Sequence, residues 1–462
     1  MVAHGFLAAL LAGAAPAPLL TFDDALKRAE EHNLDLKVAQ AKLAQAHELS
    51  RKLWASYLPQ LSVAGGYTRN SAEAKISLPT TYFVRDVFQN QGPAFDPSRP
   101  PGLDNPPGAQ TPYILIPDPA GFVSLTIQPF NQWAGQASLS QAIIAPALWP
   151  AIRSAYLGEN IAKLGTETAR REILFAAAQL YYGAAGLKEA LKVQRRMLES
   201  NVAHEKDAQV RYQAGALPKV AYLRAEIDRV RAEQDLKRSE NGLESAKSAL
   251  NALLDQEGDF DVALPAEPTL PADPSKLAES ATNDRPDLQA ARKILDLALL
   301  QREGVWYQFL PNVGLTAKYS LSNITGFTGK YDSWAVGVGA SWTIWDGGLR
   351  EAALRENAQK VIESTAARRS AELKAADEVR RALLELDSAR ANKVKASEQL
   401  QLARENMGLV NVSYESGAAT YLEVTDANAA LLGAEINAVA EGLNASLAGL
   451  KVLKAAGQFA AR

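Results

Sequence analysis

The sequence contains no cysteine in its 462 residues. This absence excludes disulfides, thiolate metal sites, cysteine nucleophiles and, in a bacterial protein, a lipid-modified N-terminal cysteine. A block of basic residues is missing as well, since 49 Lys and Arg residues are balanced by 52 Asp and Glu residues and the net charge is -3. Without a concentrated basic surface, a nucleic-acid partner is not expected.

Groups that carry enzyme chemistry are also scarce. No two of the four histidines have the spacing of metal ligands on a helix, and no serine has a base organised beside it: His4, His32, His47, His204. The sequence therefore predicts no enzyme, no metal site and no cofactor. Two polar motifs are interpreted as structural, because Thr21 with Asp24 is expected to cap a first helix and Asp346 to begin a long one.

The N-terminus is apolar and rich in small residues. Residues 1–17 offer Ala-x-Ala-like cleavage sites, which predicts an export signal peptide. No Lys or Arg precedes the apolar run, so a transmembrane anchor and a misassigned start are the alternatives. Beyond it, no uninterrupted apolar run reaches the roughly 18 residues of a membrane-spanning helix.

The second half of the chain repeats the first. One block of identical residues recurs 252 positions later, and two further blocks recur 201 and 202 positions later, in the same order. The difference, 252 − 201 = 51, places about 51 extra residues in the first half. They include the Pro- and Gly-rich residues 91–112, which favour a long exposed loop. The blocks start at these positions and their counterparts: Asp35 and Asp287, Trp133 and Trp334, Tyr212 and Tyr414.

This duplication predicts the domain organisation. Each repeat is expected to contain a helix, strands and a long helical hairpin, and an acidic, proline-spaced linker is expected between the repeats. The predicted domains are the signal at 1–17, the first repeat at 18–254, the linker at 255–275 and the second repeat at 276–462. Within the first repeat we expect a strand-loop-strand unit near 58–145, with an inserted loop at 73–120, and a hairpin at 147–254. Within the second repeat we expect strands near 310–345 and a hairpin at 347–455.

Each predicted hairpin begins with an unusually long helix. Residues 151–214 contain no proline, and residues 349–416 contain no proline and one glycine. At 1.5 Å per residue, each run would reach on the order of 100 Å, far beyond the width of a small domain. Val379, Leu386, Leu400 and Met407 lie on one seven-residue grid that only Lys393 breaks, and this spacing predicts coiled-coil packing. The motif Tyr-x-x-Gly, at 212–215 and 414–417, is typical of a helix end, so each copy is expected at a hairpin turn.

The predicted strands alternate between two kinds of residue. Apolar residues from Val313 to Leu321 and from Trp334 to Ile344 alternate with small or polar ones, which is typical of strands with one face in lipid. A half-buried sheet in a soluble sandwich is the alternative. A dinucleotide-binding loop at Gly337 and Gly339 is excluded, because Trp342 occupies the third glycine position. Four lipid-facing strands cannot close a barrel, so a membrane protein of this kind must oligomerise.

The order of these motifs resembles the TolC-like family of outer-membrane efflux proteins. The resemblance covers nearly the whole mature chain. The motifs on which it rests are LTFDDALKRAEEHNLDL, YLPQL, FLPNV, SWTIWDGG and the two Tyr-x-x-Gly turns. It implies a mainly α fold with membrane β structure: a homotrimer in which four strands per chain join a twelve-stranded outer-membrane barrel, continued by a long periplasmic coiled-coil barrel of helices. It also implies location in the bacterial outer membrane, in contact with its lipid.

The resemblance further implies a set of site residues. Glu423 and Asp426 match the acidic positions that ring the periplasmic entrance in the family. Three copies would place carboxylates around a narrow mouth and favour cations; two solvated carboxylates are the alternative interpretation.

The hairpin tips match the family's latch incompletely. Tyr414 matches a latch tyrosine, but Ala419 and Ala221 stand where an arginine and an acidic partner are expected. We therefore expect Lys219 or Arg224 to reach Glu423 or Asp426. The predicted tip and latch residues are Tyr212, Gly215, Lys219, Arg224, Tyr414 and Gly417.

The implied function is the passive exit duct of a tripartite efflux pump or a type I secretion system. The implied partners are a periplasmic adaptor (membrane fusion) protein and an inner-membrane pump of the RND or ABC type. A periplasmic coiled-coil adaptor or scaffold without a channel is the alternative, although it would lack amphiphilic strands. The sequence leaves the cargo open among drugs, metals, peptides and proteins.

Overall fold

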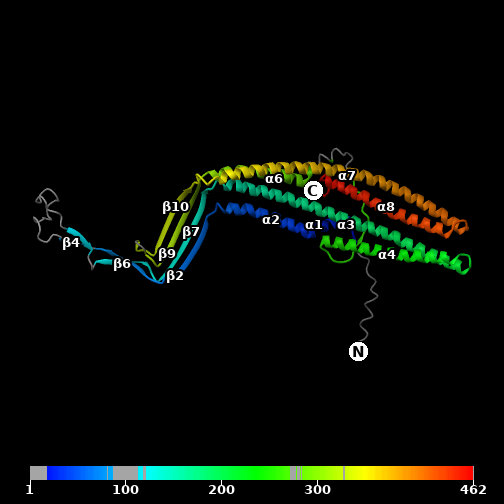
Figure 1. Cartoon of the computed structure of the whole chain (residues 1–462), viewed down its shortest axis with the longest axis horizontal. Coiled ribbons are helices and arrows are strands. Elements are labelled where there is room, and N and C mark those ends of the chain that lie inside the picture. Colours follow the sequence, from blue (N-terminus) through cyan, green and yellow to red (C-terminus); the bar gives the residue numbers. More distant parts are fainter. Residues whose placement is uncertain are drawn as a thin grey trace, which may run out of the picture. The chain divides into compact units, whose positions relative to one another are not determined.

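A computed structural model describes residues 18–80, 82–86, 113–117, 121–270, 277, 281, 283–325 and 328–460 (Figure 1). The predicted signal at 1–17 and the Pro- and Gly-rich residues 91–112 lie outside the described residues. Seven α-helices and one short 3-10 helix are described with these bounds: α1 Phe22–His32, α2 Leu34–Ala55, α3 Leu148–Gln213, α4 Lys219–Leu254, α6 Pro286–Trp306, η1 Tyr307–Phe309, α7 Leu349–Glu415 and α8 Tyr421–Ala455.

The strands are shorter, and most come from two regions of the chain. Their bounds are β1 Leu19–Leu20, β2 Gln60–Arg69, β3 Ala74–Pro79, β4 Tyr82–Asp86, β5 Tyr113–Pro117, β6 Phe122–Gln128, β7 Asn131–Ile144, β8 Asp261–Val262, β9 Asn312–Ser322 and β10 Asp332–Ser341. The chain divides into a helical unit, residues 1–51, 150–305 and 348–462, and a sheet unit, residues 52–149 and 306–347.

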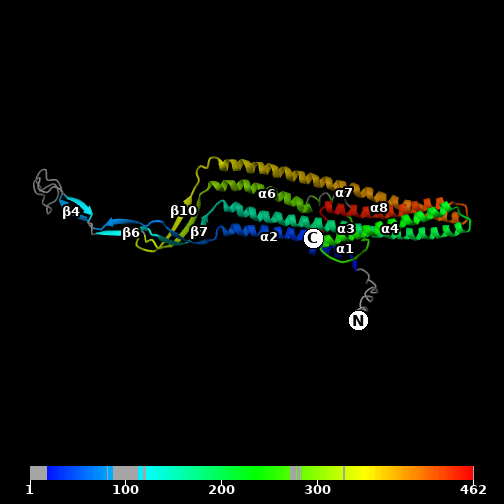
Figure 2. The same ribbon diagram turned by 60° about the horizontal axis from the view of Figure 1, so that its bottom comes forward.

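The helical unit is built on two long hairpins. Helices α3 and α7 have 66 and 67 residues, so the long helices expected from the proline-free runs are present. Each is followed by an antiparallel partner, α4 after α3 and α8 after α7 (Figures 1 and 2). On α7, Val379, Leu386 and Met407 are buried as their heptad spacing predicts, and Leu400 is half-buried. Lys393 interrupts this spacing, and its Nζ lies 2.7 Å from a carboxylate oxygen of Glu267.

The main core of the helical unit surrounds two adjacent tyrosines of α3. Tyr181 and Tyr182 are 1% and 2% exposed, and Phe22 packs edge-on against both rings. Their hydroxyls donate hydrogen bonds to the carbonyls of Leu20 (2.8 Å) and Ala266 (3.0 Å). Buried phenols need such acceptors. These contacts tie α3 to the strand β1 and to the segment that follows α4.

Two helix starts were predicted from the sequence. Thr21 caps α1, because its Oγ1 accepts a hydrogen bond from the backbone N–H of Asp24 at 3.2 Å, as predicted. The long helix α7 begins at Leu349, three residues after Asp346. Its N-cap position is Gly348, whose φ of +90° is a left-handed conformation that glycine adopts without a steric penalty.

The sheet unit contains one antiparallel four-stranded sheet in the order β10-β9-β7-β2. Two further antiparallel pairs, β3 with β6 and β4 with β5, lie in or beside the predicted insertion at 73–120. That region is therefore not all loop, which corrects the expectation. Its described ends contain β-favouring runs such as Tyr113–Pro117, YILIP, which pairs with Tyr82–Asp86.

Among the described residues, no helix has both the length and the apolarity to cross a membrane. The same residues contain no cluster of three side chains suited to hold a metal ion. The tandem duplication and its domain boundaries stay predictions.

Candidate functional site

The four-stranded sheet has one polar face. Residues that are directly opposite on neighbouring strands point to the same side, and the register aligns Ser62, Ser138 and Lys318 in one row across β2, β7 and β9. The Oγ atoms of Ser62 and Ser138 are 2.7 Å apart and share a hydrogen bond. The next row contains Gln60, Ser140, Thr316 and Gly337. Small and polar residues thus follow one face through all four strands.

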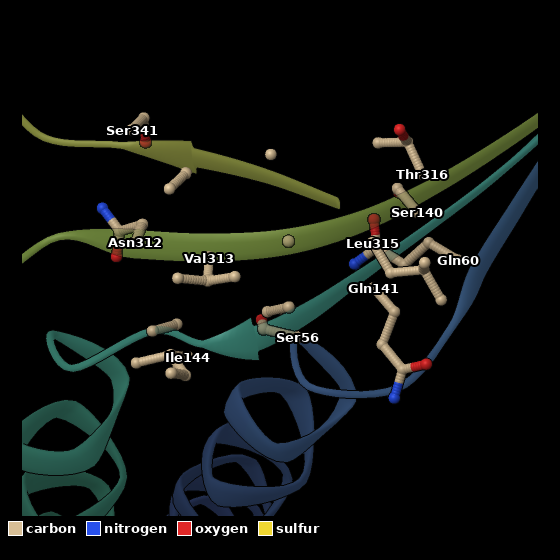
Figure 3. A pocket seen from close by; sticks show the side chains of 15 residues that line it. Ser56, Gln60, Ser140, Gln141, Ile144, Asn312, Val313, Leu315, Thr316 and Ser341 are labelled. Atoms are coloured by element: carbon tan, nitrogen blue, oxygen red, sulfur yellow. The ribbon is translucent and has the colours of Figure 1, made fainter. Parts of the chain in front are cut away.

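At one end of the sheet the strands line a shallow pocket of about 540 Å³ (Figure 3). Gln60, Ser140 and Thr316 come from three neighbouring strands, and Asn312 and Ser341 are paired on β9 and β10. The amide and hydroxyl groups here offer hydrogen bonds to water or to polar solutes, but none is an organised nucleophile or base. The pocket therefore offers hydrogen bonds beside apolar side chains such as Val313, Leu315 and Ile144.

The opposite face of the sheet is apolar and exposed. Val63, Ala137, Tyr319 and Trp334 form one row across the four strands. Trp334 is 75% exposed, and Val336 and Val338, which follow it on β10, are 61% and 67% exposed. Soluble monomers rarely expose an apolar face of this extent, so it requires an apolar medium or a partner.

The strand lengths match the thickness of a membrane. β2, β9 and β10 have 10, 11 and 10 residues, and a tilted strand of about 9 to 11 residues spans a bilayer core. The outer strands β2 and β10 each have a neighbour on one side only in the described sheet. Unpaired strand edges are not tolerated in hydrocarbon, so a sheet of this kind in a membrane would need further strands at both edges.

A second candidate site lies at the tips of the two hairpins. The turn glycines Gly215 and Gly417 have φ angles of +75° and +80°, the left-handed conformation that ends a helix. The N–H of Ala216 reaches the carbonyl of Arg211, and the N–H of Ala418 reaches that of Ser413, at 2.9 and 2.8 Å. The two turns have the same hydrogen-bonding pattern and satisfy the last carbonyls of α3 and α7.

Glu423 takes part in a capping box at the start of α8. Its carboxylate accepts hydrogen bonds from the N–H (2.6 Å) and hydroxyl (2.9 Å) of Thr420, whose Oγ1 accepts from the Glu423 N–H at 3.3 Å. The hydrogen bond from the Thr420 backbone N–H has the larger effect and the bond from its hydroxyl the smaller, and together they hold the pKa of Glu423 below its usual value. Glu423 is therefore ionised at neutral pH and fixed in orientation. The motif Thr-x-x-Glu was the sequence signal for this role.

Asp426 lies one turn further along α8 and is exposed. Together with Glu423 it lines a groove of about 490 Å³ on the α7–α8 hairpin, and Asn406 and Ser413 lie on the opposite, α7 side. The two predicted ring carboxylates therefore share one groove near the tip.

Tyr414 joins the two hairpins, through residues that the sequence did not single out. The guanidinium carbon of Arg211 lies 4.7 Å from the centre of the Tyr414 ring, and Arg211 Nε lies 2.9 Å from Asp207 Oδ2. The Tyr414 hydroxyl is 3.4 Å from the same carboxylate oxygen, and its ring packs edge-on against Tyr421. Burial raises the pKa of the Tyr414 phenol. The spacing of Asp207 and Arg211, four residues on one helix, was the available signal.

The other predicted tip residues take different places. Tyr212 stacks on Tyr222 across the first hairpin, with ring centres 5.8 Å apart. Within the described part of one chain, no ion pair joins Lys219 or Arg224 to Glu423 or Asp426, so the expected latch contact stays a prediction.

The outer membrane efflux protein family model matches residues 277–458 of this chain. The resemblance to the TolC-like family is confirmed. No curated protein sequence matches the chain. The TolC-like fold extends over nearly the full length, as similar solved structures show. Vibrio cholerae outer membrane protein VceC has a TM-score of 0.70 at 20% identity, covering 94% of this chain and 96% of VceC.

Two structures titled as outer membrane channels are similar to the same degree. The Campylobacter jejuni channel CmeC has a TM-score of 0.71 at 17% identity, covering 95% of this chain and 86% of CmeC. The Neisseria gonorrhoeae channel MtrE, solved in its open state, has a TM-score of 0.69 at 18% identity, covering 94% of this chain and 88% of MtrE. At these identities the likeness establishes the TolC-like fold alone.

Proposed function

We propose that this protein is the outer-membrane exit channel of a tripartite efflux pump or a type I secretion system. It conducts substrates passively from the periplasm to the exterior. The observation that carries the proposal is the four-stranded sheet. It has one apolar face and one polar face, and the strand at each edge is paired on one side only in the described sheet. An apolar outside in lipid and a polar inside around water are the two surfaces that a membrane barrel needs.

Closure requires more than one copy. In the proposed assembly, β2 of one chain pairs with β10 of the next, so that no edge faces lipid. Three copies of a four-stranded sheet give twelve strands, the assembly that the family resemblance implies. The long hairpins then form a periplasmic helical tunnel, and the chain lies in the bacterial outer membrane.

The periplasmic entrance is proposed to lie at the hairpin tips. Glu423 and Asp426 of each copy would form its acidic ring, attracting cations and raising the barrier to anions. The Thr420 bonds would keep the Glu423 carboxylates ionised and in place. We assign the closed-state latch to Tyr414 with Asp207 and Arg211, because this contact joins α7 to α3.

The proposed partners are a periplasmic adaptor and an inner-membrane pump of the RND or ABC type, which would supply the energy. Cargo selection is assigned to those partners. The alternative of a coiled-coil adaptor or scaffold is disfavoured, because it leaves the exposed apolar face of the sheet without a function.

Cross-linking tests the proposed strand pairing. Because the chain has no cysteine, Ala64→Cys on β2 and Ala335→Cys on β10 introduce unique thiols on the polar face. With a short bis-maleimide, the double variant in outer-membrane preparations is expected to give covalent dimers and trimers and nothing larger. Each single variant is the matched control and should stay monomeric. A double variant that stays monomeric, or protein that fractionates without detergent as soluble, would contradict the proposal.

A further inference from the structure

One charged side chain lies on the polar face of the four-stranded sheet. Directly opposite residues share a side, so the register puts the even-numbered residues of β2, β7 and β9 and the odd-numbered residues of β10 on this face. Every residue of this set is uncharged except Lys318. The set runs from Gln60 to Thr68, from Gln132 to Ala142, from Asn312 to Ser322 and from Ser333 to Ser341. The polar face of the described sheet therefore carries one charge, and that charge is positive.

Lys318 lies near the middle of β9, away from the ends of the strand. The apolar face has charged residues only at strand ends, where Arg69 is the last residue of β2 and Asp332 is the first of β10. At the midplane of a membrane a lysine on the lipid side of a strand destabilises the protein, whereas near the interfaces it is tolerated. This distribution of charge fits lipid on the apolar face and water on the face of Lys318.

The Lys318 ammonium group is not offset by a carboxylate on this face. The side chain is exposed, and within the described part of the chain it forms no ion pair. Its neighbours across the strands are Ser138 and Ala335, and its neighbours along β9 on the same side are Thr316 and Ser320. These side chains are all shorter than that of lysine, whose flexible four-carbon stem holds a compact, hydrated charge. The charge is therefore accessible to mobile anions in the water over this face.

The next step rests on the proposed function, in which three copies place three such lysines inside one barrel. Twelve strands about 4.8 Å apart and tilted by about 40° give a barrel on the order of 24 Å wide between opposite backbones. Its axis then lies about 12 Å from the wall, close to the Debye length of about 10 Å in about 0.1 M salt. The lysines therefore act across the lumen in dilute salt. In about 1 M salt the Debye length falls to about 3 Å and their charges are screened.

We propose that Lys318 forms a cationic ring inside the barrel, which concentrates anions and the anionic groups of passing solutes. Threefold symmetry puts the three lysines at one level. Their charge is opposite in sign to that of Glu423 and Asp426 at the proposed entrance. A solute in the barrel thus meets a wall that favours anions, after an entrance that favours cations. Lys318 is in this way a second determinant of charge selectivity, on a different part of the path.

Permeability measurements in planar bilayers test the ring. The starting protein is the full-length Glu423→Gln/Asp426→Asn variant, so that the proposed entrance charges do not dominate the selectivity. In about 0.1 M KCl, adding Lys318→Gln should raise the potassium-to-chloride permeability ratio about two- to threefold, and in about 1 M KCl it should leave the ratio unchanged. Adding Lys318→Arg, which keeps the charge, should keep the lower ratio.

The outcomes separate this inference from the proposed function. Currents whose permeability ratio in dilute salt is the same with and without Lys318→Gln would overturn the ring and uphold the channel. A wild-type oligomer that gives no current would overturn the channel proposal and the ring together.

Restoring the charge chemically gives a second readout on a single sample. The chain has no cysteine, so Lys318→Cys introduces a unique thiol. A methanethiosulfonate reagent with a trimethylammonium group forms a disulfide with this thiol, releases methanesulfinate and should lower the ratio again. The reagent with a sulfonate group adds a negative charge and should raise the ratio further. Tyr319→Cys, the next residue on β9 but on the apolar face, is the matched control and should respond to neither reagent. Equal responses at the two positions, or no response at Lys318→Cys, would contradict a lumen position for Lys318.

Discussion

At the second hairpin tip, Thr420 and Glu423 satisfy each other's polar groups, and the first tip has no such box because Pro218 precedes α4. Thr420→Ala removes the hydroxyl that caps the Glu423 N–H. A lost N-cap costs about 1 kcal/mol, so amides of residues 420–424 should exchange with deuterium about fivefold faster in native conditions. Thr420→Ser keeps the hydroxyl and is the control, expected to exchange as the wild type does.

The Glu423 carboxylate makes the stability of the second hairpin tip depend on pH, in a direction that follows from its pKa shift. The pKa of Glu423 is lower in the folded chain than its ordinary value of 4.5, so the ionised group stabilises the tip above that pH. This contribution is lost as the pH falls through the folded pKa. Glu423→Gln, which cannot ionise, should therefore differ from wild type in tip exchange near neutral pH and converge with it in acid. A difference that is constant with pH would contradict the capping role.

At the scale of the element, the hairpin turns depend on glycine. Gly417 has φ +80°, and a Cβ added there would meet no atom within 4 Å, so Gly417→Ala changes backbone strain alone. The strain costs about 1 to 2 kcal/mol. Limited proteolysis of the second tip should become several-fold faster, because cleavage follows the population of the opened turn.

Gly408 provides the matched control for this substitution. It lies inside α7, and a Cβ there would also meet no atom within 4 Å of the same chain. Because alanine is the better residue inside a helix, Gly408→Ala should leave tip proteolysis unchanged or slow it. Faster cleavage in both variants would mean that the turn conformation is not the cause.

At the scale of the whole molecule, the acidic entrance predicts ion selectivity. In planar bilayers the detergent-purified oligomer should give small, cation-selective currents. The double variant Glu423→Gln/Asp426→Asn, which removes both charges while keeping side-chain size, should bring the cation-to-anion permeability ratio toward one. Glu441→Gln, on α8 outside the tip groove, is the control and removes one carboxylate elsewhere on the same helix. Selectivity that survives the double variant would exclude these residues from the entrance while leaving the channel proposal intact.

The local features of the fold were predictable from sequence because they depend on near neighbours. The absence of proline predicted the long helices now seen as α3 and α7, and alternation predicted the two faces of β9 and β10. The Thr420 capping box was equally local and was missed, although the related Thr-x-x-Asp cap was recognised at Thr21. The left-handed conformation of Gly348 at the start of α7 was not singled out from the sequence.

By itself, the sequence determined the lengths of the helices, the places where they turn, the amphiphilic strands and the TolC-like resemblance. Only the tertiary structure decided that β7 lies between β2 and β9, that Asp207 and Arg211 meet Tyr414, and that Lys318 is aligned with Ser62 and Ser138. The physical reason is the separation along the chain of the residues that interact. Helix and strand patterns repeat every few residues along one chain segment, whereas these contacts join segments that are tens to hundreds of residues apart and exist only once the helices and strands have packed.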